Sequence, residues 1–320
     1  MLFLFLAQKN KNLFIFSFKM KQFLLKIGLF AIVFFIIDKG FYYFLDVAPK
    51  LEYDERLELV INGKINKDLI VLGSSRGADN IIASQIENQT KLSSYNLSYI
   101  GSNVIFHEFI LKSILKFNEK PKIIIFSIDN PYEFIEEKSL LFRLDRLYPL
   151  SKYNYINQEL INKEERNLLS WTFCLARLTK TNFALKQVKT PLENPILSCG
   201  STPFVKKSSS SKMNFSESFE KYNTKNELPE KLKSFRRIQT ICKVNNIKLI
   251  FVFSPNYCNF NTNFYRRFQK LMFAENKVLV YDNTNLLYKD EAYYFDVSHL
   301  MKNGAIVFTT EISTFINQNK

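Results

Sequence analysis

The sequence predicts an α/β fold in which helices cover both faces of a parallel sheet. Short runs of apolar residues, such as 69–72, 123–128 and 248–253, alternate with longer segments of helical periodicity. Continuous apolar runs of this length are typical of parallel strands that are buried on both faces. The alternation therefore indicates a three-layer α/β/α domain with a five-stranded parallel sheet in the flavodoxin-like order.

Each expected element follows from its own pattern. The expected strands are 69–72, 92–99, 123–128, 248–253 and 277–281. The expected helices are 76–89, 104–117, 230–245 and 263–273, followed by a closing amphipathic helix that carries Ala305, Phe308, Ile312 and Phe315. Ligands bind such sheets at the carboxyl ends of the strands, so the turns after the strands are where functional residues are expected.

Between residues 131 and 230 the alternation of strands and helices lapses. We expect a mainly helical insertion here, with a helix over 164–186 that contains Trp171 and a loop over 190–214. An insertion that follows a strand stands over the carboxyl edge of the sheet, so it is a candidate lid or substrate-selecting element. Packing against the sheet edge, without a functional role, is the alternative interpretation.

Composition limits the classes of function. A chain of 320 residues with 47% hydrophobic content can bury the core of one domain and still carry attachments. The formal charge of +14 does not indicate nucleic-acid binding, because the lysines are interleaved with acids and no nucleic-acid-binding motif is present. A weak attraction to anionic membrane surfaces or acidic polysaccharides is the interpretation that remains.

The cysteines do not indicate a metal site. Cys174, Cys199, Cys242 and Cys258 have no C-x-x-C spacing, and the two histidines are far apart in the sequence. Disulfides outside the cytoplasm and buried free thiols both remain open. We expect no metal and no cofactor.

The N-terminal region has the pattern of a membrane anchor. Residues 1–22 are expected to be a basic tail. The uncharged run 27–37 is too short for a bilayer core, which needs about 20 residues. An extension to 23–45, with Lys26 reaching towards the interface, is long enough and predicts a transmembrane signal-anchor.

Charge predicts the orientation of this anchor. Lysines precede it and acids dominate the sequence that follows, so the positive-inside rule places the domain 46–320 on the side away from the cytoplasm. We expect an uncleaved anchor rather than a cleaved signal peptide, because an Ala-x-Ala-like site is lacking after the apolar run. Met20 is an alternative start of the chain.

A candidate nucleophile follows the first strand. The run 69–72 leads into Gly73, Ser74 and Ser75, with a helix expected next. A serine in such a strand–helix turn projects its hydroxyl above the strand ends, where the helix N–H groups also point. This arrangement suits a nucleophile whose transition state develops an oxyanion. Gly-Ser turns are common, so this motif alone does not exclude an ordinary turn.

A candidate base lies near the other end of the chain. His299 is one of only two histidines, and it follows Asp296 by three residues. A nucleophilic serine needs a base within hydrogen-bond reach and a carboxylate that fixes the tautomer of that base. His107 has no carboxylate in the same relation, so we interpret it as a packing or surface residue.

These two motifs together resemble the SGNH (GDSL-like) hydrolase superfamily, and more narrowly the membrane-anchored SGNH-like proteins of bacterial cell envelopes. The resemblance implies that Ser75 is the nucleophile, His299 the base and Asp296 its partner. It also implies an oxyanion or substrate-binding set beside them. The members of this set are Gly101 in the block 96–101, Asn130 or Asn103 as side-chain donor, and Ser74.

The third block of the family departs from its pattern in this chain. An asparagine that donates to the oxyanion is expected after the third strand, and Asp129 occupies that position. Asn130 and Asn103 are the two possible substitutes, and the sequence does not decide between them. The departure keeps open a protein of this fold without catalysis.

The resemblance implies three functions. The first is a serine esterase or deacylase that acts on an acylated cell-envelope polysaccharide or lipid through an acyl-enzyme. The second is an O-acyltransferase that uses the same triad, and the third is a catalytically silent module that binds glycan or scaffolds an envelope assembly. In each case the expected location is the inner membrane, as a single-pass protein with its domain on the outer side.

Overall fold

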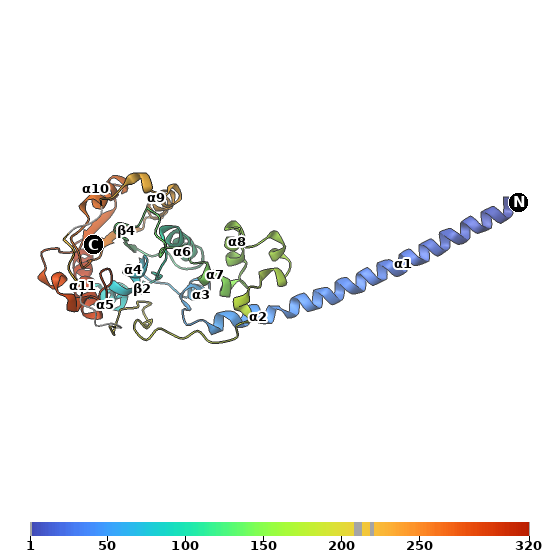
Figure 1. Cartoon of the computed structure of the whole chain (residues 1–320), viewed down its shortest axis with the longest axis horizontal. Coiled ribbons are helices and arrows are strands. Elements are labelled where there is room, and N and C mark those ends of the chain that lie inside the picture. The colour runs from blue at the N-terminus through green and yellow to red at the C-terminus, as the bar shows by residue number, and fades with distance from the viewer. Residues whose placement is uncertain (1, 208–212, 218–220, 320) are drawn as a thin grey trace. The chain divides into compact units, whose positions relative to one another are not determined.

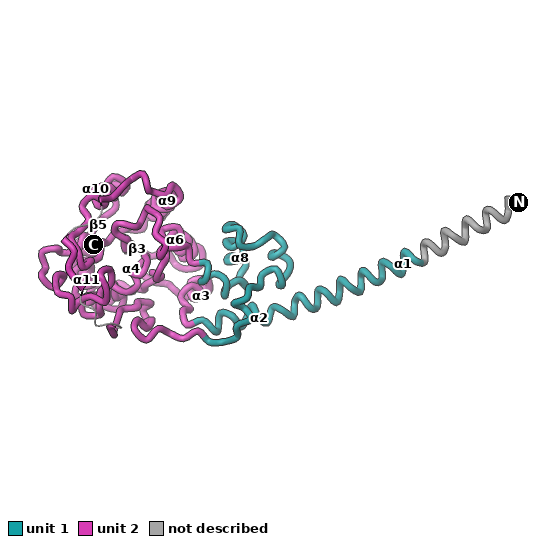
Figure 2. The backbone as a smooth tube through the Cα atoms, in the orientation of Figure 1, with its two compact units in different colours: residues 1–52, 144–187 teal, residues 53–143, 188–320 magenta. Residues whose placement is uncertain are grey.

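The computed structural model describes residues 2–207, 213–217 and 221–319. The chain forms two compact units, coloured teal and magenta in Figure 2. Unit 1 comprises residues 1–52 and 144–187, and unit 2 comprises residues 53–143 and 188–320. Part of the segment that the sequence marks as an insertion, 144–187, therefore groups with the N-terminal helix.

Unit 2 contains a five-stranded sheet of order β2-β1-β3-β4-β5 in which all neighbouring strands are parallel. Its strands are β1 Leu69–Leu72, β2 Ser94–Asn96, β3 Ile123–Ser127, β4 Lys248–Phe253 and β5 Lys277–Val280. Every residue of β1 and β3 is buried, which explains the uninterrupted apolar runs. The predicted fold class, a parallel α/β sheet of flavodoxin-like order, is confirmed.

Helices cover both faces of this sheet (Figure 1). The helices of unit 2 are α3 Arg56–Ile61, α4 Ser75–Asn80, α5 Ala83–Thr90, α6 Val104–Phe117, α9 Pro229–Val244, α10 Thr262–Leu271 and α11 Lys302–Gln318. On one face, alternate strand residues such as Val71 share a buried cluster with apolar side chains of α5 and α11. On the other face, Phe251 of β4 packs against Phe235 of α9 and Phe268 of α10, with ring centroids 5.2 and 5.1 Å apart.

The expectation of a single helix over 76–89 was wrong in one respect, because this segment forms two helices, α4 and α5. Ile81 and Ile82 between them have extended backbones, with φ of −126° and −102°. Both are buried in the cluster that includes α11, and Ile82 donates its N–H to Thr309 Oγ1 at 3.0 Å. Burial of two consecutive β-branched side chains against α11 thus takes precedence over helix continuity.

Unit 1 contains the N-terminal helix and a region of short helices. Its α-helices are α1 Leu2–Gly40, α2 Tyr42–Val47, α7 Leu144–Leu147 and α8 Asn154–Asn162. The helix expected over 164–186 was wrong, because three 3₁₀ helices occur there: Leu168–Trp171, Leu175–Arg177 and Lys180–Phe183. Asn167 and Thr179 are the N-cap residues of the first and third of these helices. Short polar side chains of this kind favour the start of a new turn over the continuation of a helix.

Helix α1 is long and apolar enough to cross a membrane, by length and composition. The side chains of residues 19–37 are exposed, whereas the next residue, Asp38, is fully buried. The stretch 41–45, which the sequence adds to the anchor, mostly belongs to a separate helix, α2, whose Leu45 is fully buried.

Candidate active site

Glycine shapes the turn between β1 and α4. Gly73 has φ +154°, and a Cβ atom at this position would lie 2.8 Å from Cβ of Ser127 on β3. Gly77 in α4 is as tightly packed, since a Cβ there would lie 2.4 Å from Ser98 Oγ. The two glycines let the turn lie directly against its neighbours. Ser75 becomes the first residue of α4, with Ser74 as the N-cap.

Ser75, His299 and Asp296 form one continuous hydrogen-bonded chain. Ser75 Oγ lies 2.7 Å from His299 Nε2. The other ring nitrogen, Nδ1, lies 2.8 Å from Asp296 Oδ2 and 2.9 Å from Oδ1. With Nδ1–H donated to the carboxylate, Nε2 of the neutral ring is left as an acceptor for the serine hydroxyl. Residues 224 positions apart are thereby joined.

The loop that carries His299 is held by hydrogen bonds within the loop and by a hydrogen bond to α4. Asp296 Oδ1 accepts the N–H groups of Ser298 and His299 at 2.8 and 2.9 Å. Leu300 donates its N–H to Asn80 Oδ1 at 2.8 Å, which ties the loop to the end of α4. The helix that begins at Ser75 therefore also positions the histidine that contacts Ser75.

The surroundings of Asp296 favour its charged form. Partial burial raises the pKa of this carboxyl group, but the hydrogen bond and charge of His299 and the two backbone donors outweigh it. The pKa of Asp296 consequently lies below its ordinary value. A carboxylate that stays charged at neutral pH can stabilise an imidazolium formed beside it.

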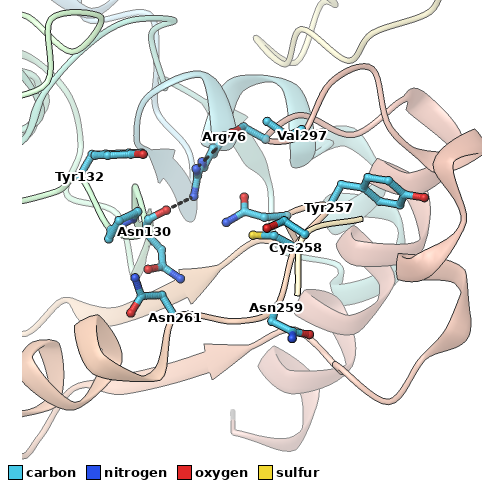
Figure 3. A pocket seen from close by; sticks show the side chains of 12 residues that line it. Arg76, Asn130, Tyr132, Tyr257, Cys258, Asn259, Asn261 and Val297 are labelled. Atoms are coloured by element: carbon cyan, nitrogen blue, oxygen red, sulfur yellow. Dashed lines mark hydrogen bonds between the residues drawn. The ribbon is translucent and has the colours of Figure 1, made fainter. Parts of the chain in front are cut away.

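A pocket with a cavity volume of about 270 Å³ is lined by residues next to Ser75 and His299 in the chain (Figure 3). Arg76 and Ser298, the chain neighbours of Ser75 and His299, are part of its wall. The other lining residues are Asn130, Pro131, Tyr132, Ser216, Asn256, Tyr257, Cys258, Asn259, Asn261 and Val297. The lining is rich in amide side chains, and Arg76 is its charged residue.

The residues that the sequence proposed for the oxyanion or for binding make different contacts in the structure. Asn130 lines the pocket, and its backbone carbonyl accepts a hydrogen bond from Arg76 Nη1 at 2.8 Å (Figure 3). Asn103 uses its side-chain oxygen to cap α6, accepting the N–H groups of Ile105 and Phe106. Gly101, with φ +71°, lies in a turn, and its carbonyl accepts the N–H of Leu141.

Ser74 points to a different partner from that of Ser75. Its hydroxyl donates to Asp129 Oδ1 at 2.5 Å, and both residues are buried. Arg76 Nε lies 3.9 Å from the same carboxylate oxygen. Asp129, at the position where the sequence resemblance implies an asparagine donor, is thus an acceptor for Ser74.

The buried cluster around Asp129 extends away from the serines. Glu133 Oε2 accepts the N–H of Asp129 at 2.9 Å. Burial raises the pKa of Asp129, and the charge of Arg76 and the Ser74 hydroxyl offset this only in part. Burial and the neighbouring Asp129 raise the pKa of Glu133 to about 8. Sequence reasoning found the unusual Asp129 but missed its contact with Ser74, because nothing in the local pattern indicates it.

His107 is a packing residue, as expected. It is buried in α6, where Nε2 lies 2.8 Å from Ser102 Oγ and the ring packs edge-on against Phe126. Burial lowers the pKa of His107 to about 3, so the ring is neutral. All four cysteines are free.

No family model matches this sequence, and no curated protein matches it. The functional argument therefore depends on the geometry of the site. A serine hydroxyl in contact with an imidazole that a carboxylate orients is an arrangement suited to nucleophilic attack on an acyl carbonyl.

Proposed function

We propose that this protein is a membrane-anchored serine esterase of SGNH type that removes acyl groups from a cell-envelope glycan or lipid. The observation that carries the proposal is the unbroken chain of hydrogen bonds from Asp296 through His299 to Ser75. Its support is geometric: the serine lies at the carboxyl end of β1, and a pocket opens beside it.

The proposed reaction proceeds through an acyl-enzyme. Ser75 Oγ attacks the acyl carbonyl carbon while His299 Nε2 takes the serine proton. The tetrahedral intermediate collapses, the bond to the leaving alcohol breaks, and the imidazolium returns the proton to that alcohol. Water, deprotonated by the same nitrogen, then attacks the ester of Ser75. The bond between the acyl carbon and Ser75 Oγ breaks, the imidazolium returns the proton to Ser75, and the carboxylic acid is released. Asp296 stabilises the imidazolium in both steps.

The lining of the pocket supports a polyhydroxylated substrate. Four asparagine side chains line this pocket, and amide groups both donate to and accept from hydroxyl groups such as those of a sugar. Of the two substrate classes, this favours the glycan over the lipid.

A second candidate function is a silent module that binds glycan or scaffolds an envelope assembly. The observation that favours it is Asp129, a buried carboxylate where the family has an oxyanion donor. Loss of one oxyanion donor costs about 10²–10³ in rate. An O-acyltransferase would use the same triad with a sugar hydroxyl in place of water, and its product would distinguish it from an esterase.

The proposed location is a single-pass anchor in the cytoplasmic membrane, with the α/β domain on the outer side. The length and composition of α1 support the anchor. The lysines at its N-terminal end, including Lys19, Lys21 and Lys26, support the orientation.

The test is covalent labelling of the full chain in detergent with a fluorophosphonate, which reacts with activated serines. We expect labelling of the wild type, its loss in Ser75→Ala and His299→Gln, and wild-type labelling in Ser139→Ala, a matched change at an exposed serine of unit 2. Absence of labelling in a wild type with a cooperative thermal unfolding transition would contradict the esterase and favour the silent module.

A further inference from the structure

We infer that a short segment of unit 1 is inserted into the lipid bilayer beside α1, as a membrane-contact patch. The patch is the uncharged stretch 168–175, and its apolar members are Leu168, Leu169, Trp171, Phe173 and Leu175. Its proposed occupant is the phospholipid layer at the C-terminal end of α1. The inference uses one part of the proposed function, the membrane-spanning α1, and is independent of the chemistry of Ser75.

Three contacts fix the patch to the end of α1. Lys39 Nζ donates to the carbonyl of Thr172 at 2.8 Å. Asp38, fully buried, accepts the N–H groups of Cys174 and Leu175 at 3.1 and 2.9 Å. The carboxylate of Asp38 thus holds this segment by two hydrogen bonds, and the segment in turn shields the carboxylate from solvent.

A fourth contact fixes the depth of the patch along the helix. Phe34 of α1 packs edge-on against Phe173, with ring centroids 5.6 Å apart. Phe34 belongs to the uncharged run that ends at Ile37. Because an α-helix rises about 1.5 Å per residue, Phe173 lies about 4–5 Å on the apolar side of the last uncharged residue.

The rest of α1 is consistent with a bilayer boundary at this level. A span of about 20 residues that ends at Ile37 begins near Phe18, with Lys19 and Lys21 in its first turn and Lys26 reaching towards the same interface. Phe35, Ile36 and Ile37 remain exposed beside the patch. The patch and these exposed apolar side chains therefore lie at the same end of the span.

The patch itself has the composition of an interfacial segment. Leu168, Leu169 and Trp171 are 72%, 58% and 45% exposed. Adjacent leucines with this exposure are unfavourable in water, whereas leucine and tryptophan are favoured at the boundary between headgroups and acyl chains. Continuity with α1 identifies the lipid layer as the surface that covers them.

The chain offers a direct probe of this inference, because Trp171 is its only tryptophan. The full chain is reconstituted into phosphatidylcholine vesicles with brominated or ordinary acyl chains, and the tryptophan emission is compared. We expect brominated lipid to remove about half of the emission or more, as for groups about 5–10 Å below the surface. Emission that brominated lipid leaves unchanged and aqueous iodide quenches would overturn the inference.

A second variant separates failure of the patch from failure of the anchor. Phe35→Trp in a Trp171→Phe background moves the probe onto α1 itself. Quenching of this relocated probe without quenching of Trp171 in the wild type would overturn the patch alone. Quenching of neither would overturn the patch together with the anchor. Neither result would alter fluorophosphonate labelling of Ser75, which tests the proposed chemistry separately.

Matched leucine variants test the role of the patch residues. Leu168→Gln with Leu169→Gln should lower the quenching of Trp171 by brominated lipid, whereas Leu192→Gln, at an 84% exposed leucine of unit 2, should not. Equal effects of both changes would contradict the inference. A third outcome is that Trp171 is protected from iodide but is not quenched by brominated lipid, and that this protection is lost when the protein is diluted. This outcome would also overturn the inference, because it would show that a second copy of the chain covers the patch.

Discussion

Two adjacent serines in this protein contact two different carboxylate systems. Ser75 contacts the partly exposed His299, whose other nitrogen contacts Asp296. Ser74 donates directly to Asp129, which is buried beside Arg76. Only the first serine contacts an imidazole, a group that can accept its proton. A strand–helix turn can thus direct one hydroxyl to an imidazole and its neighbour to a buried carboxyl group.

The two carboxyl groups that these serine systems contain differ in their pKa values. The pKa of Asp296 lies below its ordinary value because of His299 and backbone donors, whereas burial raises the pKa of Asp129. The first is therefore suited to stabilise a positive charge that forms during a reaction. The second belongs to a cluster that holds the turn in place.

The largest expected effect separates the two serines. Ser75→Ala should reduce the rate of acyl chemistry or fluorophosphonate labelling by about 10⁶-fold, as expected for loss of a nucleophile, with little change in thermal stability. Ser74→Ala should retain labelling but lose about 1–3 kcal/mol of stability, because Asp129 loses a buried donor. Labelling rates and thermal unfolding of both variants measure these two effects. Loss of labelling in Ser74→Ala alone would identify Ser74, and not Ser75, as the nucleophile.

The next effect concerns the orientation of the base. Asp296→Asn should lower the reaction rate by about 10⁴-fold, because the amide permits the wrong tautomer of His299. Asp129→Asn is the comparison, since it changes the other carboxylate in the same way, and it should lower the rate far less. Kinetics of fluorophosphonate labelling would show this, and an equal loss in the two variants would mean that both systems act on Ser75.

A smaller effect is expected for the turn that precedes the serines. Gly73→Ala should destabilise the protein by about 1–3 kcal/mol, because φ is +154° and the added Cβ would lie 2.8 Å from Ser127. Gly28→Ala in α1 is the matched control, since nothing lies within 4 Å of its Cβ position. Thermal unfolding in detergent compares them, and similar midpoints would show that this turn tolerates a side chain.

The last effect concerns the pH dependence of the buried cluster. The pKa of Glu133 is raised from 4.5 to about 8 in the folded state, so its contribution to stability is present below pH 4.5 and is lost as the pH rises through 8. Between these values stability should fall by up to about 1.4 kcal/mol per pH unit. Glu133→Gln should flatten this slope in chemical unfolding measured from pH 5 to 8, and an unchanged slope would exclude Glu133 as its source.

Much of the fold and the Asp296–His299 pair could be predicted because their signals are local. Buried parallel strands require uninterrupted apolar runs, and β1, β3 and β4 have them. Asp296 and His299 are three residues apart, so one turn brings them together. The glycine beside the serines indicates a turn from the local sequence alone, independently of distant residues.

The remaining features depend on partners that are distant in sequence. The break at Ile81 and Ile82 arises from α11, and Ser74 meets Asp129 55 residues away. The segment 168–175 has weak helical periodicity, but Asp38, 136 residues before Cys174, takes its backbone donors. Local propensity does not report such contacts, which is why the expected helix over 164–186 was wrong.

The most direct test of the account is to locate the fluorophosphonate adduct by tandem mass spectrometry of the labelled full chain. The hydrogen-bond geometry predicts a single adduct on Ser75, with Ser74 unmodified in the same peptide. An adduct on Ser74, or no adduct on a folded protein, would contradict the claim that His299 activates Ser75.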